Sequence, residues 1–133
     1  MELQLFHVYV GKLMMYCQCI EHDIKWIYAK MLKGDYVENF HVVSRNTLGE
    51  VVKELKNLDY SEGHQWLEKE DYKLLHEITG IRNYWAHQAY VDFVYDGTNT
   101  DKYKEISKKL EVDKKRLERI QLNIEKFRVA TYK

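Results

Sequence analysis

The sequence predicts an all-α fold, an up-and-down bundle of about five helices, on three observations. The chain has no proline and only 6 glycines among 133 residues, so the residues that most often interrupt helices are scarce. Apolar residues recur every three or four positions along most of its length. No run of alternating apolar and polar residues is long enough to predict a sheet, and only residues 91–95 are ambiguous.

The first helix is expected to run to about residue 33 and to end near Gly34. Its apolar stripe predicts the side that faces the core, made of Phe6, Val10, Leu13, Cys17, Ile20, Ile24, Ile27 and Met31. A second apolar strip, Val8, Met15, Cys19 and Trp26, predicts burial on a second side as well, inside the bundle or against another subunit. Both cysteines are expected to be buried thiols, because residues two apart on a helix point in directions unsuited to a disulfide.

The later helices are predicted from caps, turns and periodicity. Thr47 and Glu50 have the spacing of a capping box, which starts a short helix that runs to about Leu58. A third helix is expected over about residues 65–90, before a turn at Asp96-Gly97. A fourth helix then carries Tyr103, Ile106 and Leu110, and a fifth, with Asp113 as its N-cap, carries Leu117, Ile120, Ile124 and Phe127.

Composition narrows the class of protein. With 45% hydrophobic and 32% charged residues, the chain fits neither a disordered nor a membrane protein, and its length fits one domain, residues 1–133. The start of the chain lacks the pattern of a signal peptide and no apolar run reaches the length of a membrane span, so a cytoplasmic protein without a membrane partner is expected.

Charge is balanced overall and uneven along the chain. Residues 101–133 contain 11 Lys and Arg against 6 Asp and Glu. The basic residues Lys114, Lys115, Arg116 and Arg119 are therefore candidates for contacts with RNA phosphates, and a solvated helix face is the alternative.

The third helix has an unusual polar side. Its apolar face consists of Leu74, Ile78, Ile81, Trp85 and Ala89. The opposite stripe contains imidazoles, phenols and an amide where a solvent face would be richer in Lys and Glu, namely Tyr72, His76, Gly80, Asn83, His87 and Tyr90. Gly80 lowers helix propensity by about 1 kcal/mol relative to alanine, which indicates that another group approaches the backbone there.

Three residues of this helix form a motif, Arg82, Asn83 and His87 in the run IRNYWAH. An arginine, a polar residue, three further residues and a histidine resemble the R-x(4–6)-H signature of the HEPN superfamily, small helical bundles that include metal-independent endoribonucleases. The position of the motif near the end of a mid-chain helix, the short helix starting at Thr47 and the long first helix agree with the resemblance. It covers most of the chain in architecture and only about six residues in motif.

The resemblance implies an endoribonuclease of the toxin type, in a toxin-antitoxin or phage-defence setting, in which the ribose 2′-hydroxyl attacks the adjacent phosphate. His87 would transfer protons, since an imidazole titrates near neutrality. Arg82 would stabilise the phosphorane, and Asn83 would orient the imidazole or bind the substrate. His76, Tyr84 and Tyr90 are supporting candidates, and no metal or other cofactor is expected.

Helical geometry and the resemblance together predict a homodimer. On an ideal α-helix, side chains five positions apart point in directions that differ by about 140° around the axis. The side chains of Arg82 and His87 on one helix therefore do not reach the same small group. In the family, a symmetric dimer sets two motifs across a cleft, and the doubly apolar first helix is consistent with such an interface.

The resemblance also leaves a partner and other functions open. Some family members carry a tyrosine two residues after the histidine that a nucleotidyltransferase antitoxin modifies, whereas Tyr90 follows His87 by three. Such an antitoxin is a possible partner. The alternatives are a non-catalytic HEPN-like dimer that binds a nucleotide or a protein, and a helical interaction protein in which His76, His87 and the tyrosines form a dimer seam. A metal site is not favoured, because His22, His76 and His87 lack the usual ligand spacings.

Overall fold

The computed structural model describes residues 1–63, 65–94 and 100–131, and the elements within these ranges are all helical. The all-α bundle of about five helices is confirmed, because α4, η1 and α5 follow one another without a break and form one rod. The elements are α1 (Leu3–Met31), α2 (Tyr36–Val43), α3 (Leu48–Ser61), α4 (Lys69–Asn83), the π-helical turn η1 (Tyr84–Gln88), α5 (Ala89–Val94) and α6 (Thr100–Thr131).

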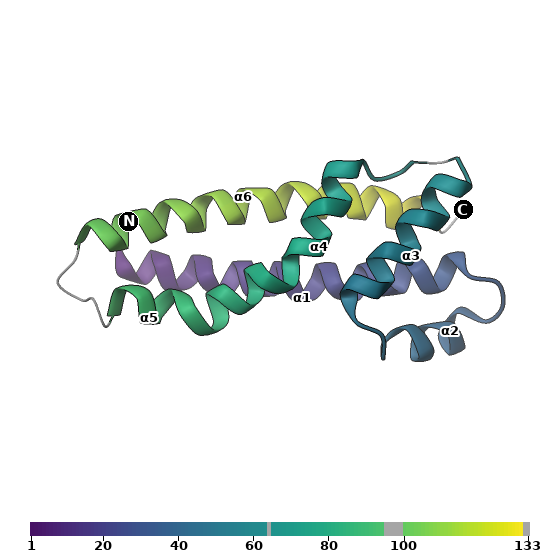
Figure 1. Cartoon of the computed structure of the whole chain (residues 1–133), viewed down its shortest axis with the longest axis horizontal. Coiled ribbons are helices and arrows are strands. Elements are labelled where there is room, and N and C mark those ends of the chain that lie inside the picture. The colour runs from purple at the N-terminus through teal and green to yellow at the C-terminus, as the bar shows by residue number, and fades with distance from the viewer. Residues whose placement is uncertain (64, 95–99, 132–133) are drawn as a thin grey trace.

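The first and last helices lie side by side and run in the same direction (Figure 1). The Tyr103 hydroxyl donates to the Met1 carbonyl oxygen at 2.8 Å, and the Tyr16 hydroxyl donates to Glu118 at 3.4 Å, so the two helices keep a constant offset of 102 residues. The rod of α4, η1 and α5 runs in the opposite direction against both of them, and α2 and α3 lie beside the C-terminal half of α1 (Figure 1). The long rods therefore alternate in direction, as an up-and-down bundle requires.

One apolar core joins these rods. The stripe predicted on α1 is buried from Phe6 to Ile27, and only Met31 at its end is partly exposed. The four largest fully buried side chains come from α1, α4, η1 and α6, and are Phe6, Tyr72, Trp85 and Phe127. Burial of such side chains contributes roughly 1.5–3 kcal/mol each, so the core is the main source of stability for the face that carries the motif.

The two short helices, α2 and α3, show which local sequence signals were sufficient to predict a helix. α3 begins where predicted, and the Thr47 hydroxyl accepts a hydrogen bond from the Glu50 backbone N–H at 3.3 Å. α2 was not predicted: Asp35 caps it by accepting from the Val37 N–H at 3.0 Å, but its only buried residue is Val43. The helix has only 8 residues, so the apolar spacing of Tyr36, Phe40 and Val43 covers about two turns and is too short to identify a helix by itself.

The predicted break at Asp113 is wrong. α6 continues through this residue, and Asp113 is buried and accepts a hydrogen bond from the Trp85 indole N–H at 2.9 Å. Val112, which precedes Asp113, is exposed. The predicted turn at Asp96-Gly97 lies outside the described residues, and the ambiguous stretch is helical up to Val94.

The second apolar strip on α1 is open to solvent in this single chain. Val8 and Met15 are exposed, and Trp26 is partly buried with its ring 5.8 Å from that of Tyr36. The prediction of two buried thiols is wrong for Cys19, which is exposed on this strip. The strip is thus exposed at Val8, Met15 and Cys19, whereas Trp26 at its end packs against Tyr36 of the same chain.

Candidate functional site

The motif lies across the junction of α4 and the π turn. Arg82 and Asn83 end α4, His87 belongs to η1, and the Ala89 N–H donates to the Tyr84 carbonyl five residues earlier. A π turn has more residues per turn than an α turn and is often found at functional sites. Around the helix axis, it therefore makes the angle between the Arg82 and His87 side chains smaller than in an ideal α-helix, where it is about 140°. It also places Asn83 and His87 close to one line parallel to the axis.

Arg82 is held by the first helix. Its Nη1 lies 2.8 Å from a carboxylate oxygen of Glu21, whose other oxygen is 3.3 Å from the Lys25 Nζ. About a third of the Arg82 side chain remains exposed, at 32%. Glu21 thus fixes the guanidinium while one side of it stays open to a ligand, and sequence reasoning did not find Glu21.

His87 and Asn83 are exposed, and neither side chain makes a hydrogen bond or an ion pair to any described residue. Their neighbour Val91, four residues beyond His87, is exposed as well. An imidazole without such a bond to the protein has both ring nitrogens available for proton transfer. This face of the rod is the candidate catalytic surface.

Buried and hydrogen-bonded aromatic residues hold the π turn in place. Trp85 is buried and bonded to Asp113 on α6, and Ala89 at the end of the turn is also buried. The Tyr84 hydroxyl donates to Asp92 at 3.2 Å. Burial, together with the nearby Asp92 carboxylate, raises the pKa of Tyr84 to about 12, so the phenol stays neutral at physiological pH.

Tyr90 lies on a different side from His87. Its hydroxyl is 2.6 Å from the His7 Nδ1, and the two rings stack at 5.4 Å. Burial also raises the pKa of Tyr90. Tyr90 therefore points toward α1, although a regular α-helix would have placed it on the face of His87.

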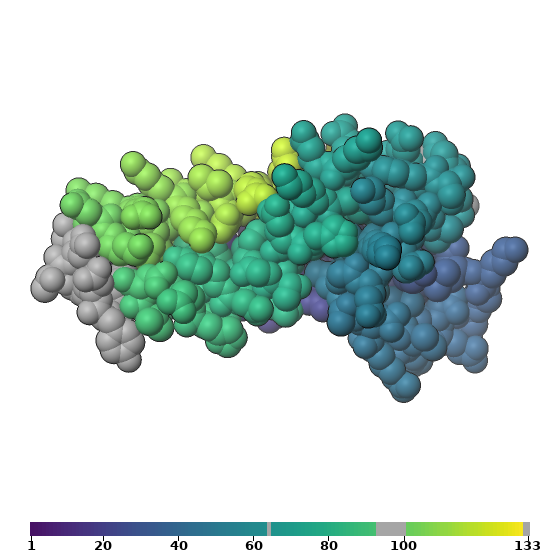
Figure 2. Space-filling view, in the orientation of Figure 1, coloured from purple at the N-terminus to yellow at the C-terminus, as the bar shows by residue number. Residues whose placement is uncertain are grey.

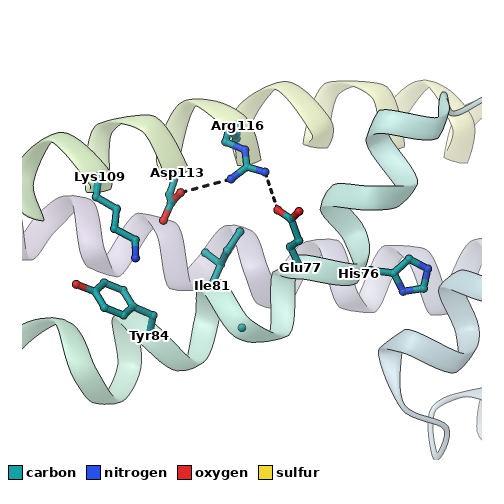
Figure 3. Close-up of a pocket in the computed structure, with 8 residues that line it drawn as sticks. His76, Glu77, Ile81, Tyr84, Lys109, Asp113 and Arg116 are labelled. Carbon is teal, nitrogen blue, oxygen red and sulfur yellow. Dashed lines mark hydrogen bonds and ion pairs between the residues drawn. The ribbon is translucent and has the colours of Figure 1, made fainter.

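His76 and Gly80 on α4 and Tyr84 at the start of η1 line a groove of about 420 Å³ that faces α6. The His76 ring points away from Arg116 and Tyr84 (Figure 3). On the opposite wall, the Lys109 Nζ lies 3.6 Å from the centroid of the Tyr84 ring. Tyr72, which the polar stripe had included, is instead fully buried, and its hydroxyl donates to Asp59 at 2.6 Å. The stripe thus divides into a core tyrosine, a groove and the exposed motif face.

Of the four basic candidates on α6, Lys115, Arg116 and Arg119 lie within about 100° of one another around the helix, whereas Lys114 lies about 100° or more from each of them. Lys114 pairs with Glu118 at 2.8 Å, and this hydrogen bond raises the pKa of Lys114 and lowers that of Glu118. Arg116 bonds to Glu77 at 2.7 Å, and Arg119 borders a separate pocket beside Asn123. Lys115 is exposed.

The apolar strip on α1 faces away from the motif. Cys19 and Glu21 are two residues apart, and hence about 200° apart around the helix, and it is Glu21 that contacts Arg82. In the view of Figure 2, α4, η1 and α5 lie in front of much of α1, and α3 lies in front of its C-terminal part. A dimer built on this strip would not bring two copies of the motif together.

Comparisons with models of protein families, with curated proteins and with solved structures find no match to this chain. Within the described residues, no helix has an apolar stretch long enough to cross a membrane. The same residues contain no group of three or more His, Cys, Asp or Glu side chains placed to hold a metal ion.

Proposed function

We propose that this protein is a metal-independent endoribonuclease of the HEPN toxin type, which cleaves RNA by attack of the 2′-hydroxyl on the adjacent phosphate. The π turn inside the R-x(4–6)-H run is the observation that carries the proposal. It sets Asn83 and His87 along one exposed line and brings Arg82 nearer to them, so a cation, an amide and an imidazole border one surface.

Each group has one task in the proposed reaction. His87 transfers protons to and from the ribose oxygens, and Arg82 offers a planar fork of donors to the phosphorane. Glu21 acts through Arg82, since an ion pair at 2.8 Å limits the rotamers of the guanidinium. Asn83 lies one turn before His87, where its amide can bind the substrate or the imidazole.

A second copy of the chain completes the proposed site. The exposed line of Asn83, His87 and Val91 is the face on which two motifs can meet around a two-fold axis. An isologous pairing there sets the His87 of each protomer opposite the Arg82 of its partner. Control by an antitoxin, including a nucleotidyltransferase, belongs to the same proposal.

Activity of single variants tests the proposal. His87→Ala and Arg82→Ala are each expected to reduce RNA cleavage by about a hundredfold or more, because each removes a group that acts on the transition state. His41→Ala and Arg45→Ala, which replace exposed residues near the end of α2, are the matched controls and should cleave as the wild type does. Cleavage should survive EDTA. Full activity of His87→Ala, or loss of activity with the chelator, would contradict the proposal.

One observation favours a second function, a non-catalytic HEPN-like module that binds a nucleotide or a protein. The Arg82 guanidinium already has a carboxylate partner in Glu21, as a purely structural arginine would. Purified protein that binds RNA or nucleotides but cleaves no RNA, with equal results for wild type and His87→Ala, would support this alternative.

A further inference from the structure

Gly80 is a residue that the fold itself does not require. It lies exposed within α4 in helical conformation, and a Cβ placed on it would meet no atom within 4 Å. Glycine in a helix interior costs about 1 kcal/mol relative to alanine. A ligand that occupies the space beside Gly80 explains why a better helix former is absent.

The groove beside Gly80 presents two flat groups that are fixed from elsewhere. The Arg116 guanidinium is held by Glu77 at 2.7 Å and by Asp113 at 3.7 Å, and Tyr84 is tied at its hydroxyl to Asp92 at 3.2 Å. Figure 3 shows Arg116 on α6 and Tyr84 at the start of η1, both along the same groove. Planar groups that are already ordered stack on a flat heterocycle with little further loss of entropy.

The polar groups of the groove add an anion partner and an acceptor. The Lys109 Nζ lies over the Tyr84 ring at 3.6 Å, where it can move to a phosphate without leaving the groove. One oxygen of Glu77 accepts from Arg116, and the other accepts no hydrogen bond from the described residues. A carboxylate oxygen of this kind accepts from an exocyclic amino group of a base.

We propose that this groove is a subsite for one unpaired ribonucleotide, which prefers a base with an amino group, adenine, cytosine or guanine, over uracil. Its volume of about 420 Å³ lies in the range of small-molecule sites. Gly80 precedes His87 by seven residues, which is about 10 Å along the rod at roughly 1.5 Å per residue. The position of the subsite beside the cut bond rests on the proposed ribonuclease function, whereas nucleotide binding itself does not.

Titration of the full chain with the four nucleoside 5′-monophosphates, followed by amide shifts in NMR spectra, tests the subsite. Saturable shifts at groove residues are expected with AMP, CMP and GMP, and weaker ones with UMP. Gly80→Leu should abolish them, and Gly11→Leu, at an exposed glycine of α1 with equal open space, should not. Gly80→Ala, which adds one carbon without a clash, should weaken binding and keep the fold.

Further experiments distinguish RNA from free nucleotides as the ligand, and distinguish failure of the subsite from failure of the proposed ribonuclease function. Binding of a short single-stranded RNA with no binding of mononucleotides, lost again in Gly80→Leu, supports the subsite and identifies RNA as the source. Equal shifts with inorganic phosphate alone, or wild-type binding by Gly80→Leu, would overturn it. Glu77→Ala, which removes both acceptor oxygens, should bring AMP to the level of UMP, and an unchanged preference would overturn base reading. A protein that binds nucleotides through Gly80 but cleaves no RNA would refute the ribonuclease and leave the subsite standing.

Discussion

Replacing Asp113 by alanine should destabilise the protein by about 2 kcal/mol. The carboxylate is buried and accepts the Trp85 indole N–H at 2.9 Å, so alanine leaves a buried donor unpaired, which costs about 1–3 kcal/mol. The contact with Arg116 at 3.7 Å adds little, because the guanidinium is 40% exposed. Asp113→Asn keeps an acceptor oxygen and should lose only about half as much.

Equilibrium unfolding in urea measures this change. With a slope of about 2 kcal/mol per molar, the midpoint of Asp113→Ala should fall by about 1 M. Glu111→Ala, at an exposed position of the same helix, is the control and should shift stability by less than about 0.5 kcal/mol. Equal midpoints for Asp113→Ala and the wild type, or equal losses for Asp113→Ala and Asp113→Asn, would refute the role given to the indole bond.

Three further predictions concern thiols, salt and mass. Burial raises the pKa of the Cys17 thiol to about 11, so a thiol reagent at pH 8 should modify exposed Cys19 rapidly and Cys17 only on unfolding. The variant Cys19→Ser should lose the fast phase of modification. Two rapidly modified thiols in the wild type would contradict the burial of Cys17. Because the charged form of Cys17 is disfavoured in the folded state, its contribution to stability is present below pH 9 and is lost as the pH rises toward about 11. Lys115 and Arg119 have no ion pair with a described residue. Reversing both charges should weaken the dependence of RNA affinity on salt concentration without unfolding the protein. An unchanged salt dependence would mean that these residues only form a solvated helix face. Light scattering at micromolar concentration should give about twice the 16.1 kDa chain mass, and a monomer would remove the composite site.

Local signals were enough to predict much of the fold. The stripe from Phe6 to Ile27 predicted α1, and the Thr47 cap predicted α3, because spacing and caps depend on neighbours in the chain. Asp113 looked like a cap because aspartate is common at helix starts. Its actual partner, Trp85, is 28 residues away, and no local pattern contains such a contact.

The candidate site was predictable only in part. The spacing of Arg82 and His87 marked the motif. The group expected to approach the backbone at Gly80 is not found among the described residues, since a Cβ placed there would meet no atom within 4 Å. The π turn between Arg82 and His87 could not be predicted, because it depends on burial of Trp85 and Ala89 against other helices. Glu21 was missed for the same reason, since it meets Arg82 across 61 residues of sequence.

The chemical identity of the RNA ends after cleavage tests the central claim most directly. If the substrate's own 2′-hydroxyl attacks the phosphate, mass spectrometry of the products should show a 2′,3′-cyclic phosphate on one fragment and a 5′-hydroxyl on the other, in the presence of EDTA. A substrate with a single 2′-deoxy nucleotide at the cut position should remain intact there. Products with 5′-phosphate ends, or cleavage at the deoxy position, would contradict the mechanism assigned to Arg82 and His87.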